Sequence, residues 1–302
     1  MKFGGIEAGG TKIICGRGDY ENGKLTVTEE ARFPTVRPEI VIPRLLDWFR
    51  AHPVEALGIA SFGPVDLHRD SPSYGFVKDT PKDGWQEVDF CGPFRKEFGI
   101  PVAFDTDVNG AALGEAVYGG GKGCRSVVYM TVGTGIGVGV YSDGRLLHGL
   151  IHPEGGHMRV TRKKGDDFRG SCRAHRTDGD AVCMEGFACG PAIEQRWGEK
   201  GEALADRREV WETEAWYLAQ GVTNLVLLYS PEKIFLGGGV MHREELFPLI
   251  REGVKRYIGG YVRSPKLEEE IDTYIVPPAL GDHAGLIGAI ELGRREWESF
   301  RK

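Results

Sequence analysis

Two aspartates at the end of an expected strand are the first residues in this sequence that could do chemistry. Asp105 and Asp107 follow a β-rich run at 102–105 and precede a helix expected over 108–118. Open α/β sheets present reactive groups beyond the carboxyl ends of their strands. A carboxylate there could accept the proton of a hydroxyl group that attacks a phosphoryl group. The alternative for either aspartate is a cap on the following helix.

Three glycine-rich turns offer the backbone N–H groups that bind phosphate. One such turn alone is more often an ordinary hairpin, but three in one chain favour a nucleotide site. None is a Walker loop, and the glycines at 133–137 run into a strand, not into the helix of a dinucleotide-binding fold. The residues expected to bind nucleotide are Gly9, Gly10, Thr11 and Lys12, then Gly133, Thr134 and Gly135, then Gly237, Gly238 and Gly239.

A group of cysteines and histidines in the middle of the chain indicates a metal site. Cys172 and His175 have the spacing of a chelating pair, Cys183 lies one loop further on, and His157 precedes them. Thiolate and imidazole ligands suit tetrahedral Zn²⁺, and four protein ligands leave no open position, so we expect the zinc to be structural. The alternative is a set of unrelated buried thiols. That second description is the expected one for Cys15, Cys91, Cys124 and Cys189.

The elements that must position these residues repeat once along the chain, because each half begins with a strand, a glycine turn and a second strand. The first half has expected strands at 3–7, 11–16, 25–33, 56–61 and 102–105, and the second has them at 126–132, 136–141, 233–236 and 274–276. Helices are expected at 38–52, 108–118, 214–229 and 284–297. The helix at 108–118 is rich in small residues, which predicts close packing against a neighbour. His148 and His152 are expected to be loop or surface residues.

The composition indicates an ordinary globular protein. The 302 residues are 41% hydrophobic and 27% charged, with a formal net charge of −6, so two domains are expected and no basic stripe is available for nucleic acid. No run reaches the roughly 18 apolar residues of a membrane span. The first residues enter a strand at once, without a secretory signal pattern. We therefore expect a cytoplasmic protein with no nucleic-acid or membrane partner.

Taken together, the motifs resemble those of the ROK family, a branch of the sugar kinase and actin superfamily, over nearly the whole chain. The motifs that carry this resemblance are EAGGTK at 7–12, DTDVNGAALGE at 105–115, TVGTGIGVG at 131–139, HPEGGH at 152–157, the Cys/His box at 172–185 and LGGGV at 236–240. The resemblance is closest to the zinc-containing bacterial fructokinase subgroup, in which EAGGTK, the segment TPKDGW at 80–85 and the Cys-x-x-His box occur together.

The resemblance also implies roles for individual residues. It makes Asp107 the general base, and it aligns Glu7 with an aspartate that holds the nucleotide's magnesium through water. Thr106 stands where related kinases have an asparagine that is a sugar ligand, which weakens any transfer of glucose specificity. The residues that it implies for sugar binding are Thr106, Glu154, His157 and Glu185.

The fold implied by the resemblance is an α/β, two-lobed, actin/hexokinase-like fold with a ribonuclease H-like core in each lobe. We expect the first lobe to span 1–108 plus 286–302, and the second to span 109–285 with the zinc-binding loop.

The implied activity is ATP-dependent phosphorylation of D-fructose to D-fructose 6-phosphate by a homodimer, with Mg²⁺ bound to ATP and a structural Zn²⁺. Two alternatives stay open. One is a glucose, mannose or N-acylhexosamine kinase of the same family. The other is a non-catalytic sugar-binding regulator, although the regulators carry an added N-terminal helix-turn-helix for which we see no room before Phe3.

Overall fold

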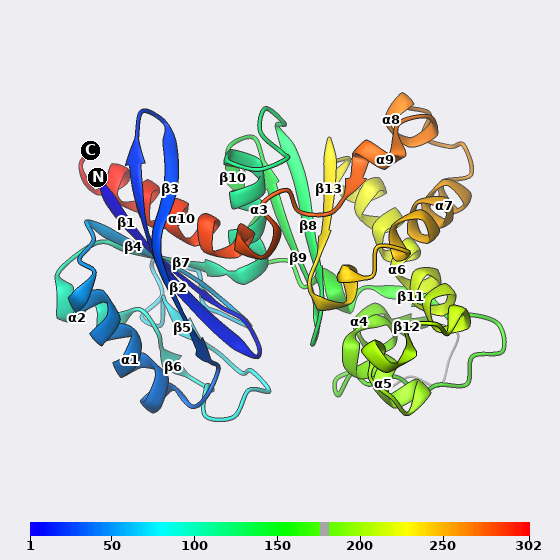
Figure 1. Cartoon of the computed structure of the whole chain (residues 1–302), viewed down its shortest axis with the longest axis horizontal. Coiled ribbons are helices and arrows are strands. Elements are labelled where there is room, and N and C mark those ends of the chain that lie inside the picture. Colours follow the sequence, from blue (N-terminus) through cyan, green and yellow to red (C-terminus); the bar gives the residue numbers. More distant parts are fainter. Residues whose placement is uncertain (176–180) are drawn as a thin grey trace. The chain divides into compact units, whose positions relative to one another are not determined.

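The computed structural model describes residues 1–175 and 181–302, and it divides the chain into two compact α/β units (Figure 1). The first unit comprises residues 1–123, 144–153 and 279–302, and the second comprises 124–143 and 154–278. The chain therefore returns to the first unit twice.

The first unit is built around one sheet covered by helices. Its strands are β1 (Lys2–Ala8), β2 (Lys12–Glu21), β3 (Lys24–Pro34), β4 (Ala56–Ser61) and β7 (Val102–Thr106), with the short β5 (Phe76–Val77), β6 (Val88–Asp89) and β10 (Arg145–Leu146). Its helices are α1 (Pro38–Ala51), α2 (Gly92–Phe98), α3 (Asp107–Val117) and α10 (Ala284–Phe300). The five-stranded sheet has the order β3-β2-β1-β4-β7. Strand β1 is antiparallel to β2 and parallel to β4, which is parallel to β7.

Strand β1 shows how side-chain alternation builds this unit. Successive residues of a strand point to opposite faces of the sheet. Phe3 packs with Ile290 of α10, whereas Ile6 packs in the core that contains Leu45 of α1. Because Glu7 lies an even number of residues from Phe3, its carboxylate is on the α10 face, next to the start of that helix.

Helices α3 and α10 pack closely in the first unit (Figure 1), as the small residues of α3 predicted. A Cβ atom on Gly288 of α10 would lie 1.7 Å from the carbonyl oxygen of Gly110, so only glycine permits this approach. The division of the chain consequently differs from the expected one at 108 and 286. Helix α3 belongs to the first unit because it packs on α10, which also covers β1 and β4.

The second unit repeats the topology of the first. Its strands are β8 (Ser126–Val132), β9 (Ile136–Ser142), β11 (Arg159–Thr161), β12 (Ala181–Cys183), β13 (Lys233–Gly237) and β14 (Ile275–Val276). Its helices are α4 (Met184–Ala188), α5 (Gly190–Trp197), α6 (Arg208–Tyr229), α7 (Leu246–Ile258), α8 (Pro265–Glu268) and α9 (Ile271–Tyr274). Within this unit the sheet has the order β9-β8-β13-β14, with β8 antiparallel to β9 and parallel to β13, and β13 parallel to β14. The expected repeat is therefore present in the strand order of both units.

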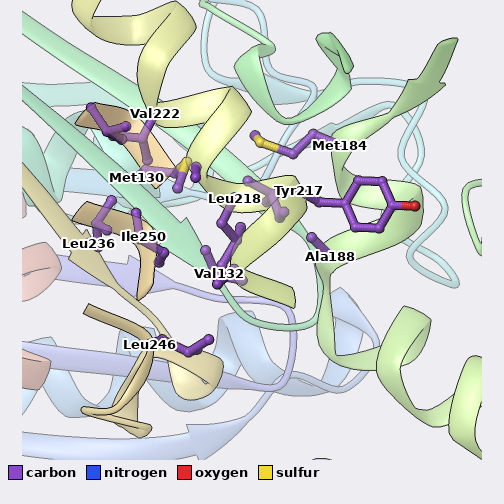
Figure 2. Packing of buried hydrophobic residues seen from close by; sticks show 14 of the residues in the cluster. Met130, Val132, Met184, Ala188, Tyr217, Leu218, Val222, Leu236, Leu246 and Ile250 are labelled. Carbon is purple, nitrogen blue, oxygen red and sulfur yellow. The ribbon is translucent and has the colours of Figure 1, made fainter. Parts of the chain in front are cut away.

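The core of the second unit lies between its sheet and the long helix α6. Figure 2 shows Met130 and Val132 of β8 beside Leu218 and Val222 of α6, with Leu236 of β13 completing the layer. Replacing one such leucine by alanine costs about 2–5 kcal/mol in proteins generally. Over residues 1–175 and 181–302, no helix is both long and apolar enough to cross a membrane.

Candidate functional site

Asp107 opens helix α3 directly after the buried strand β7, but it does not cap that helix. The cap is Thr106, whose Oγ1 accepts a hydrogen bond of 3.1 Å from the Asn109 N–H. Asp105 Oδ1 accepts from the Asn109 side-chain amide at 2.7 Å. Asp107 Oδ1 accepts from the adjacent Val108 N–H at 2.9 Å. Thr106, and neither aspartate, therefore caps the helix. The Asp107 carboxylate is available for chemistry.

The carboxyl groups of Asp107 and Glu7 both have raised pKa values, and the charge of Asp107 contributes to the shift of Glu7. Burial raises the pKa of Asp107 to about 6. Burial, and then the negative charge of Asp107, raise the pKa of Glu7 to about 7, although Lys12 opposes the shift. Within the part of the chain that the structure describes, Glu7 Oε2 is buried without a hydrogen-bond partner. Glu7 is therefore not a surface strand residue, and its carboxylate needs a cation or a proton.

Glycine 285 at the start of α10 makes room for the Glu7 side chain. A Cβ atom on Gly285 would lie 2.4 Å from Glu7 Cδ. A side chain at position 285 would therefore collide with the Glu7 carboxylate.

The first predicted nucleotide turn, at residues 9–12, joins β1 to β2. It is closed by a 2.9 Å hydrogen bond from the Gly9 N–H to the Lys12 carbonyl. Thr35 Oγ1 donates to the Gly9 carbonyl at 2.7 Å, and Lys82 donates to the Gly10 carbonyl. The carbonyl groups are thus held by the protein, while Thr11 and Lys12 remain exposed. An anion could be bound by such a turn.

The two predicted nucleotide turns of the second unit lie side by side. Gly133 to Gly135 join β8 to β9, and the Gly133 carbonyl accepts from the Gly190 N–H at the start of α5 at 2.8 Å. Gly238 follows β13 with φ +90°, and a Cβ atom on it would lie 2.5 Å from the Val132 carbonyl oxygen at the end of β8. Because β8 and β13 are neighbouring parallel strands, their glycine turns share one sheet edge.

The four predicted zinc ligands come together in the second unit. Their ligand atoms all lie within 4.8 Å of one another. Cys172 Sγ is 3.5 Å from His175 Nδ1 and 3.8 Å from His157 Nδ1, which is 3.4 Å from Cys183 Sγ. Tetrahedral zinc with ordinary Zn–S and Zn–N bonds separates its ligand atoms by about 3.6 Å. The donor set and its spacing fit zinc.

The carboxylate of Glu185 lies between the metal cluster and the glycine turn after β8. Glu185 is in α4, directly after Cys183, and its Oε2 accepts from the Ile136 N–H at 3.0 Å. Its Oε1 lies 3.9 Å from His157 Nδ1. Glu154 precedes the 3-10 helix η1 (Gly155–His157), and its carbonyl accepts from the His157 N–H at 3.0 Å. Two predicted sugar ligands of this unit, Glu154 and Glu185, therefore lie next to His157, which is also a predicted zinc ligand.

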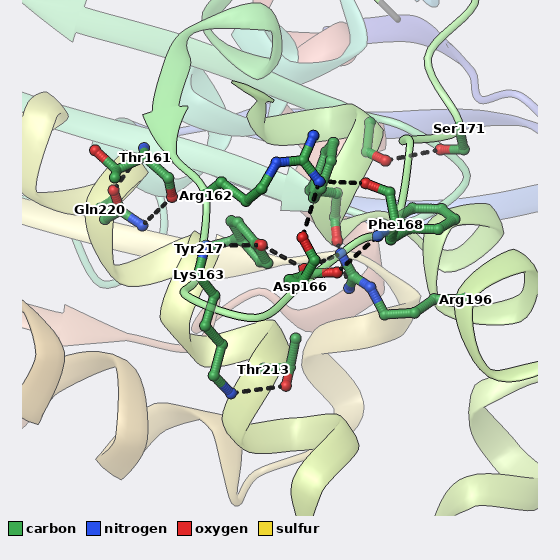
Figure 3. A network of polar contacts seen from close by, with 12 residues as sticks. Thr161, Arg162, Lys163, Asp166, Phe168, Ser171, Arg196, Thr213, Tyr217 and Gln220 are labelled. Atoms are coloured by element: carbon green, nitrogen blue, oxygen red, sulfur yellow. Dashed lines mark hydrogen bonds and ion pairs between the residues drawn. The ribbon is translucent and has the colours of Figure 1, made fainter. Parts of the chain in front are cut away.

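A second set of contacts holds the loop that carries Cys172 (Figure 3). Arg196 donates to Asp166 Oδ2 at 3.1 Å and to the Phe187 carbonyl of α4 at 3.0 Å. Its guanidinium lies 4.6 Å from the ring centroid of Phe168 and 5.3 Å from that of Tyr217. The side chains of Arg196 and Asp166 are only 8% and 10% exposed, so this pair is largely removed from water. The loop is therefore tied to α4 independently of the metal ligands.

Two histidines described as loop or surface residues from the sequence have defined contacts in the first unit. His148 Nε2 is 2.9 Å from Asp105 Oδ2. His152 is 5% exposed, and its Nε2 accepts from the Val65 N–H at 3.3 Å. Both lie in a loop, as expected: His148 is exposed at the surface, whereas His152 is buried. The signal that could have found these contacts is a histidine four residues before the histidine that opens the HPEGGH motif.

Two α/β units with the same strand order, each with a glycine turn after its first strand, define the actin/hexokinase-like fold class. Within that class, the chain belongs to the ROK family, whose sequence pattern matches residues 3–296.

Known proteins similar to this chain match it over nearly its full length. Fructokinase from Pediococcus pentosaceus is 42% identical over 294 residues, which cover 97% of this chain and 98% of the relative. The ROK hexokinase from Thermus thermophilus superposes with a TM-score of 0.77 at 28% identity, covering 99% of this chain and 100% of that one. A ROK family glucokinase from Streptomyces griseus, in complex with glucose and AMPPNP, gives a TM-score of 0.76 at 26% identity, with coverage of 98% and 100%.

Proposed function

We propose that this protein transfers the γ-phosphoryl group of ATP to D-fructose and forms D-fructose 6-phosphate. One observation carries the proposal: Asp107, at the position where the family has its base, is partly buried, has a raised pKa and is not needed as a helix cap. The choice of fructose rests on the fructokinase that is 42% identical over nearly all of both chains. We further propose that the enzyme is a cytoplasmic homodimer, as the family resemblance implies.

Asp107 acts as the general base in this mechanism. It accepts the proton of the sugar's primary hydroxyl while the hydroxyl oxygen bonds to the γ-phosphorus, and the bond from that phosphorus to the β–γ bridging oxygen breaks to release ADP. A pKa of about 6 leaves the carboxylate ionised at neutral pH and still basic enough to take a proton.

The role proposed for Glu7 is to hold the nucleotide's magnesium ion through a water molecule. Mg²⁺ keeps most of its waters in proteins, so a carboxylate can hold it through a water molecule. The buried, unpartnered Oε2 of Glu7 fits that use. When bound with ATP, Mg²⁺ neutralises the phosphate oxygens. Glu7 then stays ionised because a cation replaces its missing partner.

The remaining roles follow the glycine turns and the metal cluster. The turns at residues 9–12 and 133–135 bind phosphates through N–H groups other than those of Gly9 and Gly133, which close the turns onto the Lys12 and Gly135 carbonyls. Residues 237–239 lie against the adenosine. Thr106, Glu154, His157 and Glu185 bind sugar hydroxyls, because charged acceptors suit a polyol. Zn²⁺, held by His157, Cys172, His175 and Cys183, fixes the loop and orients His157.

The test is phosphorylation of a hexose panel by the purified protein. Fructose, glucose, mannose and N-acetylmannosamine are compared by kcat/KM with ATP, and zinc is measured on the same preparation. Fructose well ahead supports the proposal. Glucose or mannose ahead would instead support a hexokinase like the structurally similar ROK proteins. Lack of turnover with every sugar would leave a sugar-binding regulator.

A further inference from the structure

The segment at residues 147–153 lies across the carboxyl ends of β4 and β7 in the first unit. Three contacts anchor it: His148 to Asp105, the Leu150 carbonyl to His68 Nε2 at 2.9 Å, and His152 to the Val65 N–H. In open parallel sheets, ligands bind outside the carboxyl ends of the strands. This segment is therefore fixed at the edge of the sheet where Asp107 also lies.

The two histidines of the segment differ in how far their rings are exposed to solvent. His152 is 5% exposed and sits against Gly63, so its ring fills space and receives a backbone hydrogen bond. The side chain of His148 is 40% exposed, although its Nε2 is held by Asp105, which is only 4% exposed. A buried group thus holds one edge of an imidazole whose ring remains accessible.

Asp105 also fixes the tautomer of His148. Nε2 lies 2.9 Å from Asp105 Oδ2 and 3.3 Å from the Asn109 side-chain nitrogen. A carboxylate accepts hydrogen bonds only, so the shorter contact is made when Nε2 carries the proton and donates it to Asp105. The hydrogen bond to Asp105 raises the pKa of His148, and the charged ring would donate from Nδ1. In the neutral ring, Nδ1 is an acceptor. The other oxygen, Oδ1, accepts from Asn109 and from the Thr106 N–H, which holds Asp105 in place. The result is a rigid acceptor next to the first turn of α3, the turn that begins with Asp107.

We infer that His148 is a substrate-contacting residue whose Nδ1 accepts a hydrogen bond from a hydroxyl of the acceptor sugar, with Asp105 as its positioning residue. The inference rests on the proposed kinase function. A hydroxyl matched by a fixed acceptor lets a site reject analogues that lack that hydroxyl, so His148 contributes to the choice of sugar.

The experiment compares wild type, His148→Ala, His148→Asn and the control His68→Ala. Each is assayed with fructose and with 1-deoxy-, 3-deoxy- and 4-deoxyfructose at saturating ATP, and the KM for ATP is measured separately. Melting temperature and zinc content are measured for all four proteins. His68→Ala is the matched control because it removes another anchor of the same segment without touching Asp105.

The expected wild-type result is that one deoxy analogue loses at least about 10-fold in kcat/KM. His148→Ala should raise the KM for fructose about 10-fold, leave the KM for ATP within about 2-fold, and phosphorylate that analogue nearly as well as fructose. His148→Asn, whose amide oxygen can stand near the position of Nδ1, should restore part of the discrimination. His68→Ala should keep the wild-type profile.

Other outcomes overturn the inference or the function separately. If His148→Ala slows all substrates equally, or if His68→Ala reproduces its effect, His148 only supports the segment and the inference is wrong. If His148→Ala does not fold, His148→Asn decides alone, and an unchanged analogue profile in that variant is again contrary. If wild type prefers another hexose, the deoxy series of that hexose is used. A wild-type protein without kinase activity overturns the proposed function, and the inference with it.

Discussion

Replacing Asp107 by asparagine should remove activity and stabilise the protein at the same time. The substitution keeps the size of the side chain and deletes its charge. As the general base, Asp107 should contribute roughly 10²–10⁴-fold to kcat. The same carboxylate is partly buried, and this burial raises its pKa from 3.8 to about 6. A group of this kind is a cost to folding whenever it is ionised.

The size and sign of that cost follow from the two pKa values. Because the folded pKa is the higher one, the wild type loses stability as the pH rises from about 4 to about 6, and the full loss is present at pH 8. At about 1.4 kcal/mol for each pKa unit, the loss is about 3 kcal/mol. Asparagine carries no charge, so the variant should gain up to about that amount at pH 8 and almost nothing at pH 4. Removing the charge also lowers the pKa of Glu7, which acts in the same direction.

Urea unfolding followed by circular dichroism at pH 5 and pH 8 measures this difference, and the coupled ADP assay measures kcat. Asp70→Asn is the matched control, because it makes the same substitution at an exposed position of the same unit. It should change the free energy of unfolding by less than about 0.5 kcal/mol. Equal stability of Asp107→Asn and wild type at pH 8, or a gap that does not grow with pH, would refute the buried-charge reasoning. Near-normal kcat would remove Asp107 from the role of base.

Four further outcomes are expected. The value of kcat/KM should fall about 10-fold per pH unit below pH 6, since a protonated Asp107 cannot accept a proton; a flat profile down to pH 5 would contradict this. Cys172→Ser should reduce bound zinc from about one per chain, measured by mass spectrometry, and lower the melting temperature; full zinc retention would refute the ligand set. Arg196→Met should cost about 3–5 kcal/mol in urea unfolding because it leaves Asp166 buried and unpaired, whereas the exposed control Arg208→Met should cost under about 1 kcal/mol. Gly288→Ala should destabilise by at least about 2 kcal/mol because its Cβ would overlap the Gly110 carbonyl, and a smaller loss would mean that α3 and α10 separate easily.

The elements of this fold could be predicted from local pattern because most of them are short strands bounded by glycine or proline. The strand 56–61 is read from a short, continuous apolar run, and the turns at 9–12 and 133–135 are read from their glycines. The start of α6 was missed, since the expected helix began at 214 and the observed one begins at 208. Polar residues of the first turn, Glu209 and Glu212 among them, hide the apolar period there.

The sequence by itself determined which residues are able to do chemistry: the Asp105–Asp107 pair, the three glycine turns and the four Cys and His residues. These depend on residue type and on short spacing along the chain, and both can be read directly from the sequence. Only the tertiary structure decided that Glu7 faces Gly285 from the α10 side and that His148 contacts Asp105. Those facts join residues separated by up to 278 positions in the printed sequence. No local propensity encodes such pairings, because they are set by which strands neighbour each other and by how closely a helix can approach the sheet.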